Sequence, residues 1–342
     1  MNHTKKKVSL QTIADQLGVS KFSVSLAINN KPGVGNELRE KILKTADELG
    51  YQKTKRNTDN RSNKNILVLI PEYIRNDISF YNTIYWAIEN EIKERGYNAI
   101  LTSVDTEMEE HLLLPSVYDA MGCIGMIAVG VLSEAYIKRL MELKQPLISV
   151  DQYYDSIALD SINAANEEGA YQTVRYLIEC GHKDIGFIGA LGMTSSIYGR
   201  WFGYYKAMTE ANLPICQEHC ITANSPLNTL LHDQDELEYH LNQMPSFPSA
   251  WFCAGDMVAI ALINVLKKRN LDIPNDISVA AFDDIEPASI IVPTLTTYNV
   301  PRNLMGRTAV SLLLAKIENP QGVKRTVLHG SLVIRDSVKK LN

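Results

Sequence analysis

The chain has 342 residues, 45% of them apolar, which exceeds the usual size of one domain and is ample for a well-buried core. It shows no apolar segment of signal-peptide or membrane-spanning length, so we expect a cytoplasmic protein without membrane contact. The net charge of −5 is divided unevenly, because residues 1–65 hold 13 Lys/Arg and 6 Asp/Glu, a net +7, while the remainder carries −12. A basic head on an acidic body is typical of a protein in which only the head meets phosphates.

The five cysteines are odd in number and scattered, which favours core thiols in a reducing compartment over a disulfide framework. Only Cys216, His219 and Cys220 are clustered. They lack a second ligand pair at finger-like spacing, so the cluster favours packing over a metal site. We therefore expect neither a metal nor a cofactor.

The first predicted element is a short amphipathic helix over residues 10–17. Its apolar side chains recur at helical spacing, at Leu10, Ile13, Ala14 and Leu17. Ser9 precedes it as an N-cap and Gly18 follows as a stop. A sharp turn then leads to a second helix.

Ser20 caps this second helix, in which Val24 and Ile28 face inward. Its outward side chains are predicted to be Lys21, Phe22, Ser23 and Ser25. A third helix begins near Asn36 and ends at Gly50. Three short helices with a tight turn between the first two predict a helix-turn-helix; a generic three-helix bundle would need neither the basic excess nor the polar outward face.

Residues 8–30, continued by 39–43 and 48–51, resemble the DNA-binding headpiece of the lactose-repressor (LacI) family. The resemblance implies that side chains of the second helix reach base edges, here Lys21, Phe22 and Leu26. It also implies that small polar residues contact phosphates, here Ser9, Ser20, Ser23, Ser25 and Asn29. Leu26 departs from the family, many of whose members carry an arginine at this position.

Residues 53–64 contain no core-forming side chains and are predicted to be a hinge between a headpiece (1–52) and a body (65–342). In the resembled family, a hinge helix inserts a leucine into the minor groove. Asn57 and Asn60 stand where its apolar residues would fall. We expect Lys55 and Arg56, together with Arg61, to contact DNA here as charges instead.

In the body, short apolar strands alternate with helices as far as Leu295, which predicts parallel sheets covered by helices. The predicted strands are 66–70, 97–101, 123–129, 146–150, 185–188, 250–253 and 277–282. Ligands of such folds bind beyond the carboxyl ends of the strands. Asp151, Asp256 and the pair Asp283 and Asp284 follow predicted strands, where each could instead cap a helix.

The body also resembles the effector-binding body of the same family, itself similar to periplasmic sugar-binding proteins, through residues 80–81, 94–97, 166–170, 181–185, 200–203, 274–279 and 282–284. The resemblance implies that Phe80 and Tyr81 stack on an effector, that Asp151, Arg200 and Asp283 fix its polar groups, and that Asp256 lies at the cleft. These groups suit a polyol such as a carbohydrate. On the residues alone, the alternatives are a surface salt bridge for Arg200 and ordinary core packing for Phe80 and Tyr81.

Two other classes of protein fit the sequence less well. An enzyme is not supported, because neither a nucleophile elbow nor a phosphate-binding loop is present and the spacing of Gly186, Gly189 and Gly192 does not fit a dinucleotide turn. A pure solute-binding protein would need neither the head nor its charge.

The sequence predicts an α/β protein with a three-helix headpiece and a two-lobed, periplasmic-binding-protein-like body. We expect lobe 1 at about 65–160 and 290–320, and lobe 2 at about 161–289 and 321–342. The expected function is regulation of transcription by a homodimer on a palindromic double-stranded operator, controlled by a small molecule that binds between the lobes.

Overall fold

The computed structural model describes residues 9–28, 33–49, 51, 64–76, 79–192, 194–222, 234–320 and 322–341. The chain forms two compact units, Met1–Ser62 and Asn63–Asn342. Four residues expected to contact DNA, Asn29, Lys55, Arg56 and Arg61, lie outside the described residues, as does most of the predicted hinge.

The first unit contains the three expected helices, α1 (Leu10–Leu17), α2 (Lys21–Ile28) and α3 (Asn36–Glu48). Ser9 caps α1 through a capping box with Thr12, and Gly18 ends it in the left-handed conformation at φ 64°. The helices enclose a small core made of Ile13, Ala14, Val24, Ala27, Ile42 and Ala46. Their apolar residues at helical spacing therefore build one packed unit.

The second unit is built from two six-stranded sheets. Its strands are β1 (Asn65–Pro71), β2 (Asn98–Val104), β3 (Gly125–Val129), β4 (Leu147–Val150), β5 (Asp160–Ala164), β6 (Ile185–Ile188), β7 (Cys220–Ile221), β8 (Ala250–Cys253), β9 (Ser278–Asp283), β10 (Thr296–Asn299), β11 (Arg325–Leu328) and β12 (Ser331–Val333). Its α-helices are α4 (Tyr81–Glu94), α5 (Thr106–Glu110), α6 (Ser116–Met121), α7 (Glu134–Met141), α8 (Asn166–Glu179), α9 (Ser195–Glu210), α11 (Gln234–Asn242), α12 (Asp256–Lys268) and α13 (Arg302–Glu318).

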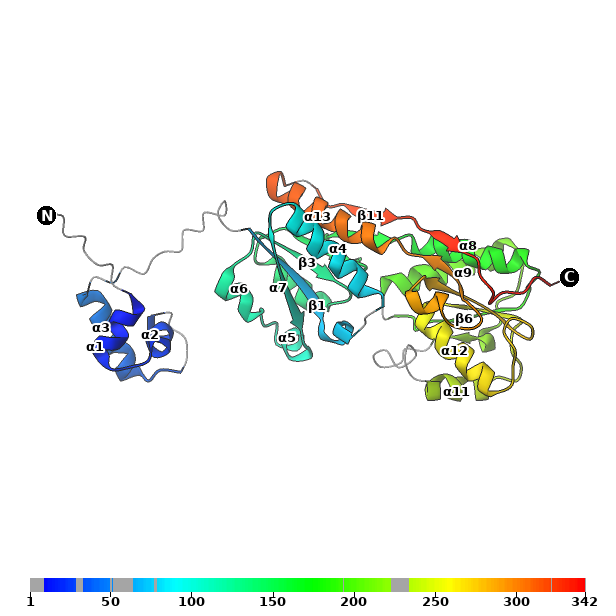
Figure 1. The fold of residues 1–342 in the computed structure, drawn as a ribbon, viewed down its shortest axis with the longest axis horizontal. Helices are drawn as coiled ribbons and strands as arrows, with labels where there is room; N and C mark the ends of the chain where they lie inside the picture. The colour runs from blue at the N-terminus through cyan, green and yellow to red at the C-terminus, as the bar shows by residue number, and fades with distance from the viewer. Residues whose placement is uncertain are drawn as a thin grey trace. The chain divides into compact units, whose positions relative to one another are not determined.

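Lobe 1 is built on the sheet β11-β5-β4-β3-β1-β2, in which every paired strand runs parallel. Helices α4 and α13 pack on one face of this sheet and α7 on the other (Figure 1). Lobe 2 is built on β12-β10-β9-β8-β6-β7, where only the β10–β12 pair is antiparallel. Because both faces of each sheet are covered, the strands β1, β3, β6 and β8 consist almost entirely of apolar residues and glycine, as the sequence indicated.

The lobe boundaries expected from the sequence need correction. β5 and β11 belong to the lobe 1 sheet, whereas β10 belongs to lobe 2. Five strands were not predicted, namely β5, β7, β10, β11 and β12. β5 and β10 are largely polar in sequence, β7 and β12 are very short, and β11 is a half-exposed edge strand, so none has the continuous apolar run that marks most of the predicted strands.

The chain crosses between the lobes three times, and each crossing is short. The crossings are Ala165 between β5 and α8, residues 300–301 between β10 and α13, and residues 329–330 between β11 and β12. The backbone N–H of Ala165 donates to the carbonyl of Leu328 at 3.0 Å, so the first and third crossings lie side by side. These crossings form the hinge of the body.

Among the helices that the structure describes, none combines the length and the apolar character needed to cross a membrane.

Candidate DNA-binding and effector-binding sites

Helix α2 carries most of the residues predicted to contact DNA. Lys21 and Phe22 in its first turn are exposed, and Phe22 is 71% exposed. Ser23, Ser25 and Leu26 are half-buried. Leu26 lies close to Gly33, since a Cβ on Gly33 would approach Leu26 Cδ1 to 3.2 Å. The exposed position of the Phe22 ring in the first turn of α2 is compatible with the base contact that the sequence predicts.

Ser9 and Ser20 have a structural role besides the predicted phosphate contact. The Ser9 Oγ accepts from the backbone N–H of Thr12 at 3.2 Å, and the Ser20 Oγ accepts from that of Ser23 at 3.0 Å. Both hydroxyls therefore satisfy otherwise unpaired N–H groups at a helix start. Both residues remain exposed.

In the body, the residues predicted to bind an effector lie beyond the carboxyl ends of β1, β4, β8 and β9, with Arg200 contributed by α9. Tyr81 and Asp151 belong to lobe 1, and Arg200 and Asp283 to lobe 2. The four come together because the carboxyl ends of both parallel sheets face the boundary between the lobes.

Asp151 is buried and adopts φ 65° directly after β4. Its Oδ2 accepts from the Tyr81 hydroxyl at 3.0 Å, while its Oδ1 is buried without a hydrogen-bond partner among the described residues. Burial raises the pKa of Asp151 from 3.8 to about 6; Arg200 and the Tyr81 bond act against that rise and Asp283 adds to it. Arg200 and Asp283 of lobe 2 are thus close enough to interact electrostatically with Asp151 of lobe 1. All three residues therefore lie at the lobe boundary.

Arg200 is only 6% exposed and is held on every side. Its Nη2 pairs with the Asp283 carboxylate at 3.0 Å, its Nε donates to Asn166 Oδ1 at 2.9 Å, and its Nη1 donates to the carbonyl of Ala254. The guanidinium also lies 4.0 Å from the ring centroid of Phe282. Arg200 is therefore not a surface salt bridge.

Phe80 and Tyr81 form an edge-to-face pair with ring centroids 5.0 Å apart. Phe80 is buried and Tyr81 is half-buried. Tyr81 can thus present both its ring and its hydroxyl to a bound molecule, whereas Phe80 supports it from behind.

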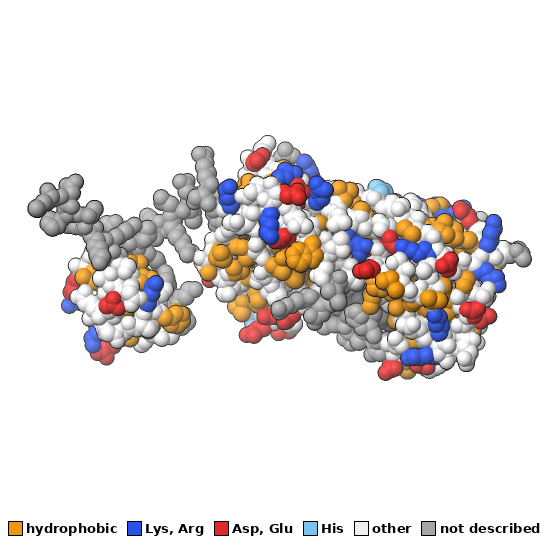
Figure 2. All heavy atoms as spheres, viewed as in Figure 1, with side chains coloured by type: hydrophobic (Ala, Val, Ile, Leu, Met, Phe, Trp, Pro, Cys, Tyr) orange, Lys and Arg blue, Asp and Glu red, His pale blue; other side chains and the backbone are white. Residues whose placement is uncertain are grey.

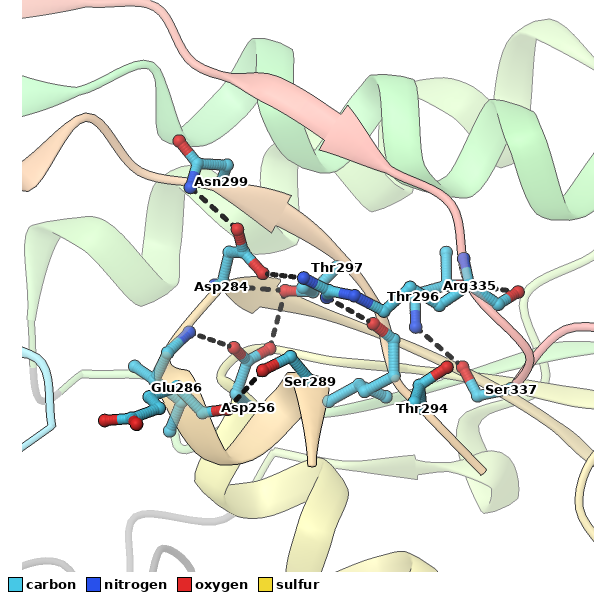
Figure 3. A network of polar contacts seen from close by, with 12 residues as sticks. Asp256, Asp284, Glu286, Ser289, Thr294, Thr296, Thr297, Asn299, Arg335 and Ser337 are labelled. Carbon is cyan, nitrogen blue, oxygen red and sulfur yellow. Dashed lines mark hydrogen bonds and ion pairs between the residues drawn. The ribbon is translucent and has the colours of Figure 1, made fainter. Parts of the chain in front are cut away.

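Asp256 does not offer an oxygen to a ligand, which corrects its expected place among the effector contacts. It is fully buried, and its two carboxylate oxygens accept from the Thr297 hydroxyl (2.6 Å) and the backbone N–H of Ile285 (2.8 Å). Burial and the neighbouring Asp283 raise its pKa well above the usual range. It acts instead inside a network that holds the turn after β9 (Figure 3).

The same network separates the adjacent carboxylates of Asp283 and Asp284. The Asp284 carboxylate is bound by Arg335 at 2.6 Å and Asn299 at 2.8 Å, and Figure 3 shows it turned toward these residues. Both aspartates have positive φ, 116° and 50°. Such a backbone persists only when its surroundings fix it, so the network sets the position of Asp283 against Arg200.

Sequence reasoning missed three residues of this site. Asn166 lies in the matching stretch 166–170 without a predicted role, although its side chain accepts a hydrogen bond from Arg200. Arg302, the first residue of α13, donates to the carbonyls of Ser79 in lobe 1 (3.1 Å) and Asp284 in lobe 2 (2.6 Å). Phe282 lies in the predicted strand 277–282 and in the matching stretch 282–284, and neither assigns it a role in the site. The only available signal was position next to a strand end, which many structural residues share.

A cavity of about 330 Å³ also lies at the lobe boundary, next to Asp151 in the chain. Its walls come from both lobes and are Glu134, Gln152, Tyr153, Tyr154, Asp155, Ser156, Gly192, Thr194, Ser195 and Tyr198. Gln152 Oε1 accepts from the backbone N–H of Ser195 at 3.1 Å and thereby links the lobes here.

A helix-turn-helix unit joined to a two-lobed α/β body with polar residues at the lobe boundary defines a ligand-binding transcriptional regulator. Comparison with known proteins agrees with this class. Residues 9–53 match the family model "Bacterial regulatory proteins, lacI family", and residues 174–338 match the model of the periplasmic binding protein-like domain. The chain thus joins a lacI-family DNA-binding domain to a periplasmic-binding-protein-like domain.

Relatives match over nearly the whole chain. The HTH-type transcriptional repressor PurR of Vibrio campbellii is 28% identical over 339 residues, which are 98% of this chain and 99% of the relative. A LacI family transcriptional regulator from Enterococcus faecium with bound ribose is 25% identical, has a TM-score of 0.67, and covers 82% of this chain and 100% of its own. The structure of the lac repressor dimer bound to operator and an anti-inducer is 23% identical and has a TM-score of 0.68. The match covers 98% of this chain and 100% of the lac repressor chain.

Proposed function

We propose that this chain is a cytoplasmic homodimer that binds a palindromic operator through its two headpieces, and that a sugar bound between the lobes controls this binding. The single observation that carries the proposal is the cluster of Tyr81, Asp151, Arg200 and Asp283, contributed by both lobes. A molecule that contacts both lobes shifts the equilibrium between their arrangements by its differential affinity for them.

A neutral sugar fits this cluster for chemical reasons. The unpartnered Oδ1 of Asp151 calls for a hydrogen-bond donor, and a sugar hydroxyl provides one. The Tyr81 ring offers an apolar face for C–H groups. The Enterococcus faecium regulator with bound ribose gives a related example. We assign no catalytic activity, since Asp283 and Asp284 have separate cationic partners rather than a shared proton.

Dimer formation is supported by the surface of lobe 1. On the face shown in Figure 2, hydrophobic side chains gather in patches over lobe 1. The exposed large apolar residues of lobe 1 include Trp86, Leu101 and Met121. The lac repressor, which shares this fold, is a dimer on its operator. Two headpieces related by a twofold axis read two half-sites.

The test uses an operator selected from random DNA by the full chain, followed by fluorescence anisotropy with a panel of sugars that includes D-ribose. Arg200→Ala should abolish the sugar response and keep operator affinity within about threefold, because Arg200 lies in the body. Arg269→Ala is the matched control, since Arg269 also packs on a phenylalanine (Phe247) and binds side chains in lobe 2, but far from this cluster. A wild-type sugar response in Arg200→Ala would show that the site assignment is wrong.

A further inference from the structure

The buried ring of Tyr298 connects the candidate effector site to the hinge. Its ring is stacked on Phe282, with centroids 4.8 Å apart and an interplanar angle of 29°. The other neighbour of Phe282 is the guanidinium of Arg200, 4.0 Å from the ring centroid. Arg200, Phe282 and Tyr298 therefore form one continuous stack, which begins at the effector cluster.

The far end of this stack reaches the third lobe crossing. The Tyr298 hydroxyl accepts a hydrogen bond of 2.8 Å from the backbone N–H of Gly330. Gly330 is one of only two residues between β11 in lobe 1 and β12 in lobe 2. A rotation of one lobe against the other must change the backbone here, because so few residues are available to absorb it.

Close packing leaves the stack little freedom. A Cβ on Gly169 of α8 would lie 2.7 Å from the Tyr298 ring and 2.8 Å from the Phe282 ring. A Cβ on Gly330 would collide with the carbonyl of Asn299, the last residue before the second crossing. The second and third crossings are thus packed against each other where Tyr298 is bonded. Small shifts in such tightly packed groups are transmitted rather than absorbed.

A second, shorter connection runs from Arg200 to the first crossing. The Arg200 Nε donates to Asn166 Oδ1, and the Asn166 amide donates to the carbonyl of Ala164 at 3.2 Å. Ala164 and Asn166 flank the crossing residue Ala165. Arg200 is therefore linked to the first crossing through Asn166 and to the third crossing through Phe282 and Tyr298.

We propose that Phe282 and Tyr298 are positioning residues that couple Arg200 to the hinge, so that the position of the guanidinium in the effector site sets the conformation of residues 329–330. This inference rests on the proposed function, in which Arg200 binds the sugar that controls operator binding. A contiguous set of contacts alone does not establish coupling, which requires that a change at one end be detected at the other.

The experiment is hydrogen–deuterium exchange of the full chain, followed at the Gly330 amide and without DNA or sugar. Arg200→Lys keeps the charge but removes the planar group that stacks on Phe282. It should raise exchange at Gly330 at least threefold. Tyr298→Phe keeps the stack and removes only the accepting oxygen, and should raise exchange at least tenfold. In the double variant, exchange at Gly330 should equal that of Tyr298→Phe alone, because the hydrogen bond between Tyr298 and Gly330 is already absent.

The matched control is Tyr204→Phe. Tyr204 is also fully buried in lobe 2, and its hydroxyl donates to the carbonyl of Ile185 at 2.8 Å, away from the crossings. It should lower Tm by an amount similar to that of Tyr298→Phe and leave exchange at Gly330 unchanged. This comparison separates coupling from a general loss of stability.

The proposal is overturned if Arg200→Lys leaves exchange at Gly330 unchanged. It is also overturned if Arg200→Lys raises this exchange by the same factor in the wild type and in the Tyr298→Phe variant. Should Tyr298→Phe fail to fold, the single Arg200→Lys variant still decides by its effect on Gly330. Because the readout contains neither operator nor sugar, failure of the proposed function would appear separately, in the anisotropy experiment.

Discussion

Asp151 is a carboxyl whose burial works against its ionisation. Because burial raises its pKa from 3.8 to about 6, the folded chain binds this proton more tightly than the unfolded chain does. The free energy of unfolding therefore falls as pH rises through the window between these two values. A ligand that donates a hydrogen bond to the Asp151 carboxylate would stabilise this buried charge.

Asp151→Asn removes this cost. At pH 7.5 the variant should be more stable than the wild type by up to about 3 kcal/mol, from about 1.4 kcal/mol per pKa unit, and near pH 4 the two should be alike. Urea unfolding at both pH values measures the difference. Asp155→Asn, which removes an exposed carboxylate, is the control. A variant less stable than the wild type at pH 7.5 would contradict this account.

We expect Phe22 to contribute to the DNA sequence specificity of the headpiece. Its exposed ring stands at the start of α2, and thymine methyl groups are the apolar partners that the major groove offers. Replacing thymine by deoxyuracil in the selected half-site should weaken wild-type binding about fourfold, which corresponds to about 0.8 kcal/mol for one methyl group.

The variant Phe22→Ala should bind the thymine and deoxyuracil operators equally. Leu43→Ala is the control, since Leu43 is an exposed apolar residue on α3 with no expected base contact, and it should discriminate as the wild type does. If Phe22→Ala still preferred thymine by the wild-type factor, Phe22 would not contact the methyl group.

At the scale of elements, Ser20 at the start of α2 has two roles, one in capping the helix and one expected in contacting DNA. The Ser20 hydroxyl caps the helix, and the same residue is expected to face a phosphate. Capping favours Ser, Asp and Asn alike, whereas a phosphate repels Asp. The two roles can therefore be separated by substitution.

Ser20→Ala should reduce the protection of the α2 amides by about 1 kcal/mol, because the cap is lost. Ser20→Asp should keep that protection and lower operator affinity at least tenfold, because a carboxylate replaces the hydroxyl opposite the phosphate. Hydrogen exchange at Val24 and operator titration give the two readouts. Full operator affinity in Ser20→Asp would place Ser20 away from the DNA backbone.

At the scale of the whole molecule, charge is divided between the two units. The DNA-binding unit is basic although the chain as a whole has a pI near 5.9. Operator affinity should therefore fall steeply with salt, by at least a hundredfold between 50 and 200 mM, in spite of the net negative charge.

A titration of salt against operator affinity tests this division. Lys21→Gln should reduce the slope of log affinity against log salt by up to about one. Lys138→Gln, which removes an exposed cation from the body, should leave the slope unchanged. A change of slope in Lys138→Gln would mean that the body also meets DNA.

The sequence by itself determined what depends on local order along the chain. Helices α1 to α3 with the caps Ser9 and Gly18, and the apolar strands β1, β3 and β8, follow from spacing and from short-range hydrogen bonding, so residue order is sufficient. Placing Asp151 and Asp283 beyond strand ends needed only the rule that parallel strands end at a common edge.

The tertiary structure alone decided which polar residue faces the lobe boundary and which is used inside the fold. Asp256 follows its strand just as Asp151 does, yet Thr297 and Ile285, both more than 25 residues away, satisfy it. The lobe membership of β10 and β11, and the contact of Tyr298 with Gly330, likewise depend on strand pairing between distant segments. Burial and long-range partners set the environment of a polar side chain, and neither is encoded in its neighbours along the chain.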